Sequence, residues 1–242
     1  MTSNGIDRRA PLAEQVYEVL RSDIVSGALP PHAQLSEPDL AERLQVSRTP
    51  LRLALARLSD EGLVVIYPQF GSFVAPIRLD AVAEAQFVRE HLECALIRDA
   101  AARIDAPMLR TLRNNLDRQA RALRDGDLEE FYALDEALHA AFAEAGGHAG
   151  VWKLIQHGKV HMDRVRHLSL SIDEHPSLLL EQHAAIVDAL AAGNANAAEA
   201  ALRVHLREVF ATVQALGLEE FCAPAMPKRR RRASAAAPGA DR

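Results

Sequence analysis

The sequence has little of what secreted, membrane-spanning and disulfide-rich proteins need. Only two of its 242 residues are cysteines, Cys94 and Cys222, which are too few for a disulfide framework. Its apolar runs all fall short of the ~18–20 residues that span a membrane, and its polar N-terminus carries no apolar stretch that could serve as a secretion signal. The sequence therefore predicts a cytoplasmic protein with no membrane segment.

Aromatic and β-branched residues are also scarce. Only 5% of the residues are aromatic, and a run rich in β-branched residues occurs only at residues 63–67. Ala, Leu, Arg and Glu dominate, and this composition favours helices. With 49% hydrophobic and 25% charged residues, the chain has an ordinary globular composition, which excludes global disorder. A mostly α-helical protein is predicted.

The net charge of -5 is spread unevenly along the chain. Residues 1–78 carry a charge of -1, residues 79–227 carry -9, and residues 228–242 carry +5. This distribution excludes a nucleic-acid binder whose whole surface is basic. A local basic face remains compatible with the sequence, because the position of the charge matters more than its total.

Three short helices and a hairpin are predicted in the N-terminal third. Apolar residues four apart, with Gly and Pro at the ends of the segments, predict helices at residues 12–26, 36–43 and 47–61. Ser36 and Ser47 are expected to cap the second and third helices. Residues 63–67 and 72–74 are expected to pair as a hairpin around a Pro-Gln-Phe-Gly turn. This order of elements is that of a winged helix-turn-helix.

The third helix carries most of the residues that are expected to read DNA. Arg48 and Arg52 are four residues apart, so they share one face of the helix. Ser47 and Thr49 stand at its start, where hydroxyl and guanidinium groups suit contacts to phosphates and guanine. Gly71 lies in the hairpin turn, which would place the tip of the wing near the DNA backbone or minor groove. These five residues are the predicted DNA-binding set.

The same segment resembles a known family. Residues 40–64, LAERLQVSRTPLRLALARLSDEGLV, and residues 70–75, FGSFVA, are similar to the winged helix of the GntR family of bacterial transcription regulators. In that family the two arginines and the wing glycine at these positions take part in DNA contact. Leu53 stands where the family usually has Glu, and Pro38 where it often has Arg. The resemblance implies a homodimer that binds double-stranded, pseudo-palindromic operator DNA.

The rest of the chain is predicted to form an antiparallel helical bundle, because short connections join long amphipathic segments. The expected helices are residues 80–103, 106–125, 127–145, 149–171, 176–192 and 195–216. The predicted fold class is therefore mostly α, with an N-terminal winged helix-turn-helix joined to a C-terminal α-helical bundle. The expected domains are residues 9–77 for DNA binding, 78–222 for effector binding and dimerisation, and 223–242 as a disordered basic tail.

Four residues of the bundle are spaced so that they can meet in its interior. Asp135 and His139 are four residues apart and share a helix face. His183 and His205 lie on either side of the turn at Gly193, roughly 15 Å and 18 Å from it along their helices. One carboxylate and three imidazoles suit Zn²⁺, Ni²⁺, Mn²⁺ or Fe²⁺. Asp135, His139, His183 and His205 are therefore candidate ligands of a divalent metal ion.

This half of the chain resembles the all-α FCD ligand-binding domain of the FadR subfamily. The matching segments are VRE and LE at residues 88–93, the Asp and Leu-His of residues 135–139, EQH at residues 181–183 and HL at residues 205–206. In metal-containing members the Asp and three His at these positions bind a divalent cation, and a carboxylate effector completes its coordination. The resemblance implies that Arg89 pairs with the effector, and Arg164 and Arg166 fit as further cations of the pocket.

The two resemblances predict a transcription regulator rather than an enzyme. It is expected to be a repressor whose operator binding responds to a small organic acid bound at the metal. Two alternatives stay open. A metalloenzyme could use the Asp/His cluster to activate water, although no general base is evident beside it. A DNA-binding protein could use the bundle only to dimerise, with the histidines buried as structural residues.

Overall fold

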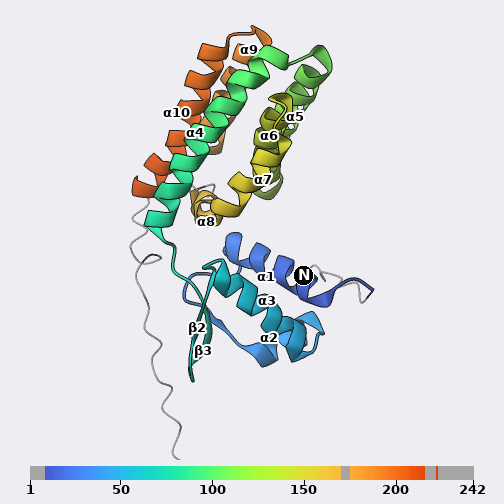
Figure 1. Ribbon diagram of the computed structural model, residues 1–242, viewed down its shortest axis with the longest axis vertical. Coiled ribbons are helices and arrows are strands. Elements are labelled where there is room, and N and C mark those ends of the chain that lie inside the picture. Colours follow the sequence, from blue (N-terminus) through green and yellow to red (C-terminus); the bar gives the residue numbers. More distant parts are fainter. Residues whose placement is uncertain (1–8, 170–174, 216–221, 223–242) are drawn as a thin grey trace, which may run out of the picture.

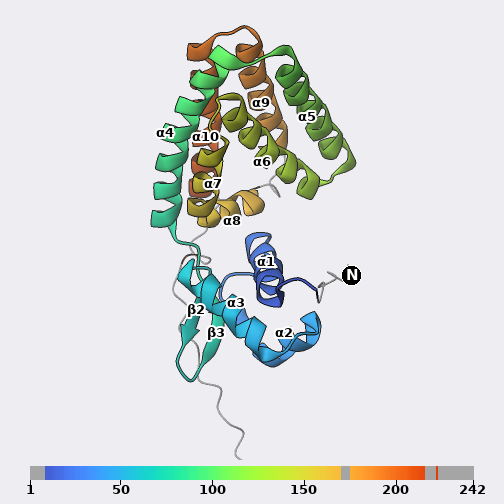
Figure 2. The ribbon, with the colours of Figure 1, turned by 45° about the vertical axis from the view of Figure 1, so that its right-hand side comes forward.

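A computed structural model describes residues 9–169, 175–215 and 222 (Figure 1). These residues form a winged helix at one end and a helical bundle at the other, joined by a short linker (Figures 1 and 2). The mostly α fold class predicted from the sequence is confirmed. The predicted basic tail lies outside the described residues. No described helix is both long and apolar enough to cross a membrane.

The winged helix begins with three helices, α1 (Leu12–Val25), α2 (Glu37–Leu44) and α3 (Arg48–Asp60). Their apolar faces meet in one core, where Leu20, Leu51 and Leu58 have no exposed surface. Ser36 and Ser47 hold the N-cap positions of α2 and α3, but neither side chain makes a capping hydrogen bond. The expected side-chain caps are therefore wrong at both positions, and the Ser47 hydroxyl stays exposed at the start of α3.

The wing is a three-stranded antiparallel sheet in the order β1-β3-β2. Its strands are β1 (Gln34–Leu35), β2 (Val64–Tyr67) and β3 (Gly71–Val74). The sequence predicted only the β2–β3 hairpin. Strand β1 has just two residues, which is too short to show the alternating pattern that reveals a strand.

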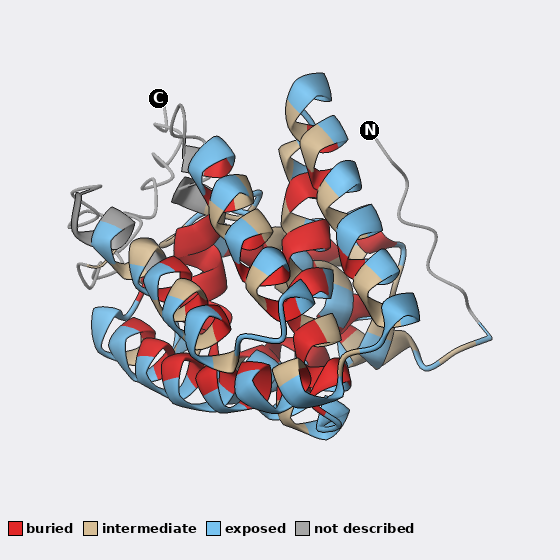
Figure 3. Ribbon diagram, turned by 90° about the horizontal axis from the view of Figure 1, so that it is seen from above, coloured by how far each residue is buried: buried red, intermediate tan, exposed pale blue. Residues whose placement is uncertain are grey.

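The bundle contains seven helices among the described residues: α4 (Leu79–Arg103), α5 (Ala106–Asp125), α6 (Leu128–Ala145), α7 (Ala149–Gly158), α8 (Val160–Ser169), α9 (His175–Ala191) and α10 (Ala195–Ala215). Asp105 and Asp127 cap α5 and α6, and their carboxylates accept hydrogen bonds from Met108 N at 2.8 Å and Glu130 N at 2.9 Å. Seen from above, the buried sides of the helices turn towards a common interior (Figure 3).

Residues 149–171 are not the single helix that the sequence predicted. The helix breaks between Gly158 and Lys159, and α8 runs in a new direction past the end of the bundle nearest the winged helix (Figure 2). Lys159 is 2% exposed, and its ammonium group pairs with Glu136 at 2.8 Å and with Asp163 at 2.5 Å. Gly158, a weak helix former, lies at the break, but a single glycine does not by itself end a helix.

Candidate metal centre and DNA-reading helix

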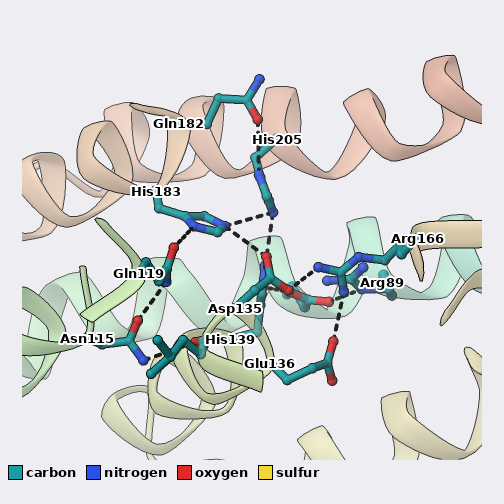
Figure 4. Close-up of polar contacts among 12 residues, drawn as sticks. Arg89, Asn115, Gln119, Asp135, Glu136, His139, Arg166, Gln182, His183 and His205 are labelled. Carbon is teal, nitrogen blue, oxygen red and sulfur yellow. Dashed lines mark hydrogen bonds and ion pairs between the residues drawn. The ribbon is translucent and has the colours of Figure 1, made fainter. Parts of the chain in front are cut away.

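Asp135, His139, His183 and His205 come together in the bundle interior (Figure 4). Helix α6 supplies the first two, and α9 and α10 supply the other two. Each of the four is at most 1% exposed, and one potential ligand atom from each lies within 4.8 Å of the others. The spatial convergence expected from the helical spacing is therefore present.

The ring nitrogens that face one another are the Nε2 atoms. His205 Nε2 lies 3.1 Å from His139 Nε2 and 3.3 Å from His183 Nε2. His183 Nε2 also lies 3.1 Å from Asp135 Oδ1. The protonation of these nitrogens decides whether the cluster is a hydrogen-bond network or a cation site.

A chain of hydrogen bonds that begins at a backbone carbonyl fixes the proton of His183 (Figure 4). The Leu134 carbonyl can only accept, and Asn115 Nδ2 donates to it at 3.0 Å. Asn115 Oδ1 then accepts from Gln119 Nε2 at 2.6 Å, which leaves Gln119 Oε1 to accept from His183 Nδ1 at 2.8 Å. His183 therefore carries its proton on Nδ1, and its Nε2 presents a lone pair.

The other two imidazoles are held in the same way. His139 Nδ1 donates to the Glu93 carboxylate at 2.6 Å, and His205 Nδ1 donates to Gln182 Oε1 at 3.1 Å. All three Nε2 atoms then face inward as lone pairs in the neutral form. Burial lowers the pKa of both His183 and His205, which keeps these rings neutral, and neighbouring imidazoles lower that of His205 further.

Asp135 Oδ1 completes a set of four acceptors. It is buried and, despite its closeness to His183 Nε2, has no hydrogen-bond partner among the described residues, because neither atom carries a proton. Lone pairs that face one another in a buried space repel unless a proton or cation lies between them. Three imidazole nitrogens and a carboxylate oxygen therefore fit a divalent metal ion.

Two buried arginines flank this set. Arg166 donates to the second oxygen of Asp135 and, at 2.8 Å, to Glu136. Burial raises the pKa of Asp135, but the charge of Arg166 holds it well below its usual range. Arg89 donates to Glu93 at 2.6 Å, and its Nη2 atom has no hydrogen-bond partner among the described residues. Burial likewise opposes the ionisation of Glu93, yet Arg89 and His139 lower its pKa to about 2.

Arg164 does not reach the cluster. Its guanidinium donates to the carbonyl oxygens of Ala75 at 2.8 Å and Pro76 at 3.4 Å, in the linker between the wing and α4. These contacts give no support to its predicted role in effector binding. A cavity of about 550 Å³ lies between the winged helix and the bundle; none of the four candidate ligands lines it, but Glu136, Lys159 and Asp163 do.

The predicted DNA-reading residues lie at the exposed start of α3 and in the wing. Ser47, Arg48, Thr49 and Arg52 are all exposed. Arg48 makes no ion pair with the residues that the structure describes, whereas Arg52 Nε lies 2.9 Å from the Glu37 carboxylate on α2. Gly71 has a φ of +107°, a backbone conformation that strains other residues. Contact of these residues with DNA stays a prediction.

Sequence reasoning missed several residues that shape the centre. Asn115, Gln119 and Gln182 orient the imidazoles, and only Gln182 had a signal, its position directly before His183. Gln86 on α4 is a separate finding: it is 8% exposed, and both of its amide atoms lack partners among the described residues. Gln86 precedes Arg89 by one helical turn, on the inward side of α4.

Comparison with known proteins decides the family. The family model for the bacterial regulatory proteins of the gntR family matches residues 12–74. The family model for the FCD domain matches residues 84–208. The chain belongs to the GntR family. It is a DNA-binding transcription regulator with an FCD effector domain, and its family and relatives are transcription regulators rather than enzymes.

Its relatives cover most of the chain. An HTH-type transcriptional regulator in an unstable DNA locus of Streptomyces ambofaciens is 41% identical over 82% of this chain and 84% of its own length. The HTH-type transcriptional repressor RspR of Escherichia coli is 35% identical over 86% of this chain and 92% of its own. A GntR regulator structure from Rhodococcus sp. RHA1 covers 84% of this chain and 98% of that one, with 27% identity and a TM-score of 0.71.

Proposed function

We propose that this GntR-family protein is a homodimeric repressor whose operator binding is controlled by a small carboxylate bound at a divalent metal. The ion would be held by Asp135, His139, His183 and His205. As a Lewis acid, it would accept a lone pair from an oxygen of the effector. Its identity among Zn, Ni, Mn and Fe stays open, because imidazole and carboxylate ligands accept each of them. The name of the relative RspR supports the choice of repressor over activator.

One observation carries the metal proposal. Glu93, Gln119 and Gln182 hold the Nδ1 protons of the three histidines, so all three Nε2 lone pairs converge on Asp135 Oδ1. A structural hydrogen-bond network would place a proton between two of these atoms. The same arrangement of outer acceptors orients histidine ligands in metal sites generally.

The charge around the centre supports an anionic effector. Three cations, those of Arg89, Lys159 and Arg166, are paired with the four carboxylates of Glu93, Asp135, Glu136 and Asp163. One negative charge is therefore in excess in this buried group. A divalent ion would reverse the excess to one positive charge, and a monoanionic carboxylate would then neutralise it. The unpartnered Arg89 Nη2 offers the carboxylate a hydrogen-bond donor.

The DNA-binding side of the proposal rests on the start of α3. Arg48 and Thr49 begin the helix and Arg52 follows one turn later, so their side chains would enter the major groove while the Ser47 hydroxyl contacts a phosphate. Arg52 would have to exchange its pairing with Glu37 for a contact to DNA. The Gly71 turn would bring the wing to the adjacent backbone or minor groove.

Helix α8 offers a physical connection between the two sites. Arg166 contacts the metal-ligand candidate Asp135, and Arg164, two residues before it, holds the linker carbonyls of Ala75 and Pro76. A shift of α8 would therefore move the linker that carries the wing. An effector changes operator affinity only if it binds one position of α8 better than the other.

Fluorescence anisotropy with DNA from upstream of the protein's own gene tests the proposal. Protein stripped of metal with a chelator and then reloaded with Zn²⁺ would be titrated in the presence and absence of citrate, malate and acetate. We expect a salt-sensitive complex whose Kd changes at least 5-fold with one of these acids, in loaded protein only. R48A should weaken the complex at least 10-fold, and R43A, which removes an arginine on α2 paired with Asp23, serves as the control.

The outcomes separate the proposal from the alternatives. A specific complex that ignores metal and every acid would favour a bundle that only dimerises. Turnover of an ester or carboxylate substrate that is lost in H183A would favour a metalloenzyme. Absence of any specific, salt-sensitive complex with the neighbouring promoters would contradict the DNA-binding part of the account.

A further inference from the structure

The outward side of α3 carries an apolar stripe. Thr49, Leu53 and Ala56 succeed one another at steps of four and three, which places them on one stripe of the helix. All three are exposed, and Leu53 is 60% exposed. Among the described residues of α1, α2 and α3, Leu53 is the single large apolar side chain that is exposed. A lone exposed leucine needs no explanation, so its place on the helix decides what it indicates.

The stripe points away from the core of the winged helix. The buried face of α3 is formed by Leu51, Ala54, Leu55 and Leu58. At about 100° per residue, the stripe lies roughly 150–170° round the helix from the middle of that face, whereas Arg48 and Arg52 lie roughly 70–110° from it. The apolar stripe is therefore the most outward part of α3, and the two arginines run along its side.

The charge on this side of α3 suits a polyanion. Residues 48–57 contain three arginines and no acidic residue, although the N-terminus of a helix favours Asp and Glu. Helix α3 packs against α1, α2 and β2, and its outward side stays open (Figures 1 and 2). A negatively charged partner can therefore reach the stripe and the arginines together.

The major groove of DNA offers a group that matches each stripe. Guanine presents two acceptors there, N7 and O6, which suit the guanidinium of an arginine. Thymine presents a C5-methyl group, which suits an apolar side chain. Two arginines beside an apolar stripe on one helix therefore correspond to guanine and thymine as neighbours along the groove.

We infer that the stripe of Thr49, Leu53 and Ala56 contacts thymine methyl groups in the major groove of the operator, and that Leu53 sets this preference. The inference rests on the proposed binding of operator DNA and goes beyond it, because it names the base and the group that are read. Ala56 is small and lets α3 approach the base edges closely. Where the family usually has Glu, this chain has Leu53, so the stripe belongs to this chain rather than to the family pattern.

Replacement of thymine by deoxyuridine in the operator tests the inference, because it removes the methyl group and keeps the hydrogen bonds of the base pair. The full chain would be titrated by fluorescence anisotropy against operator DNA in which one thymine position is replaced in both half-sites at a time. We expect at least one position at which the replacement weakens wild-type binding about 4-fold for each half-site, the effect of one buried methyl group. L53A should bind the unmodified operator more weakly and lose its sensitivity to deoxyuridine at that position.

Two further variants separate the contact from general effects of truncation. L53M keeps an apolar side chain in the stripe and should remain sensitive to deoxyuridine. L154A is the matched control, because Leu154 lies on α7 of the bundle and is 68% exposed, close to the exposure of Leu53. It should bind both operators as the wild type does. Circular dichroism should show that L53A remains folded, since the side chain that it shortens lies outside the core.

The possible results distinguish this inference from the proposed function. A wild-type chain that forms no specific operator complex would overturn both. A specific operator whose thymines can all be replaced without loss of affinity would overturn the inference while DNA binding stands. If L53A remains as sensitive to deoxyuridine as the wild type, the methyl group acts at another residue or through the shape of the DNA, and the role of Leu53 is overturned.

Discussion

Replacement of Arg166 with glutamine should strengthen metal binding and weaken effector binding. Arg166 donates to Asp135 and Glu136 and is 3% exposed, so its positive charge lies beside the centre without screening by water. This charge repels the proposed divalent ion and attracts an anionic effector. The two affinities should therefore move in opposite directions when it is removed.

The size of the effect follows from Coulomb's law. A unit charge roughly 5 Å from a divalent ion, at an effective dielectric constant of about 20, gives a repulsion of about 6–7 kcal/mol. Asp135 and Glu136 already neutralise Arg166 in part, so the net change will be a fraction of this value. We expect R166Q to bind Zn²⁺ about 10- to 100-fold more tightly, which corresponds to about 1.4–2.8 kcal/mol.

Competition titration of chelator-stripped protein with Zn²⁺ and a chromophoric chelator measures the metal affinity, and calorimetry of loaded protein measures the binding of a carboxylate that the wild type binds. K159Q is the matched control, because Lys159 carries the same charge but contacts Glu136 and Asp163 rather than Asp135. It should change the Zn²⁺ affinity less than R166Q. If R166Q binds Zn²⁺ more weakly than the wild type while remaining folded, Arg166 orients Asp135 rather than opposing the ion, and the electrostatic reasoning is refuted.

Three further predictions follow from single side chains. Arg207 and Arg203 lower the pKa of Glu90 to about 2 against the opposing effect of burial, so the folded state binds fewer protons than the unfolded state. The free energy of unfolding should therefore fall as the pH drops from about 5 to about 2. In urea titrations, E90Q should flatten this dependence on pH and cost roughly 1–2 kcal/mol near pH 7. A slope unchanged in E90Q would contradict the pairing. Both amide atoms of Gln86 are buried and have no partner among the described residues. In urea denaturation, Q86L should therefore raise the free energy of unfolding of the metal-free protein by about 1–2 kcal/mol. A variant that is less stable than the wild type would show that the amide has a partner. Q119L frees the Nδ1 proton of His183 and should lower the Zn²⁺ affinity about 10- to 100-fold in the same competition titration, whereas an unchanged affinity would show that the hydrogen-bond chain does not orient the ligand.

Helices with strong end signals were predictable from the sequence. Helix α5 was predicted at residues 106–125 and spans Ala106–Asp125, because Asp105 caps its start and Gly126, with a φ of +71°, ends it. The predicted helix at residues 149–171 failed because the turn at Lys159 depends on a partner, Glu136, that is distant in the sequence. Local propensity cannot show an ion pair that only the packed bundle creates.

The candidate site was predictable to a similar extent. The positions of Asp135 and His139 follow from helical spacing, and those of His183 and His205 from their distances to the turn at Gly193. The hydrogen-bond chain through Gln119 was not predictable, because it joins α5 to α9 through packing alone.

Arg164 and Arg166 show the limit of motif reasoning. Both fit as pocket cations from the sequence, but residues two apart on a helix point to nearly opposite sides. Once the break at Lys159 sets the direction of α8, Arg166 faces Asp135 and Arg164 faces the linker.

Metal analysis of untagged protein purified without chelator tests the central claim most directly, with H183A and H205A prepared in parallel. The account predicts about one divalent ion per chain in the wild type and its loss in both variants, which should remain folded by circular dichroism. A wild-type protein that holds no divalent metal, even after incubation with Zn²⁺, Ni²⁺, Mn²⁺ and Fe²⁺, would contradict it.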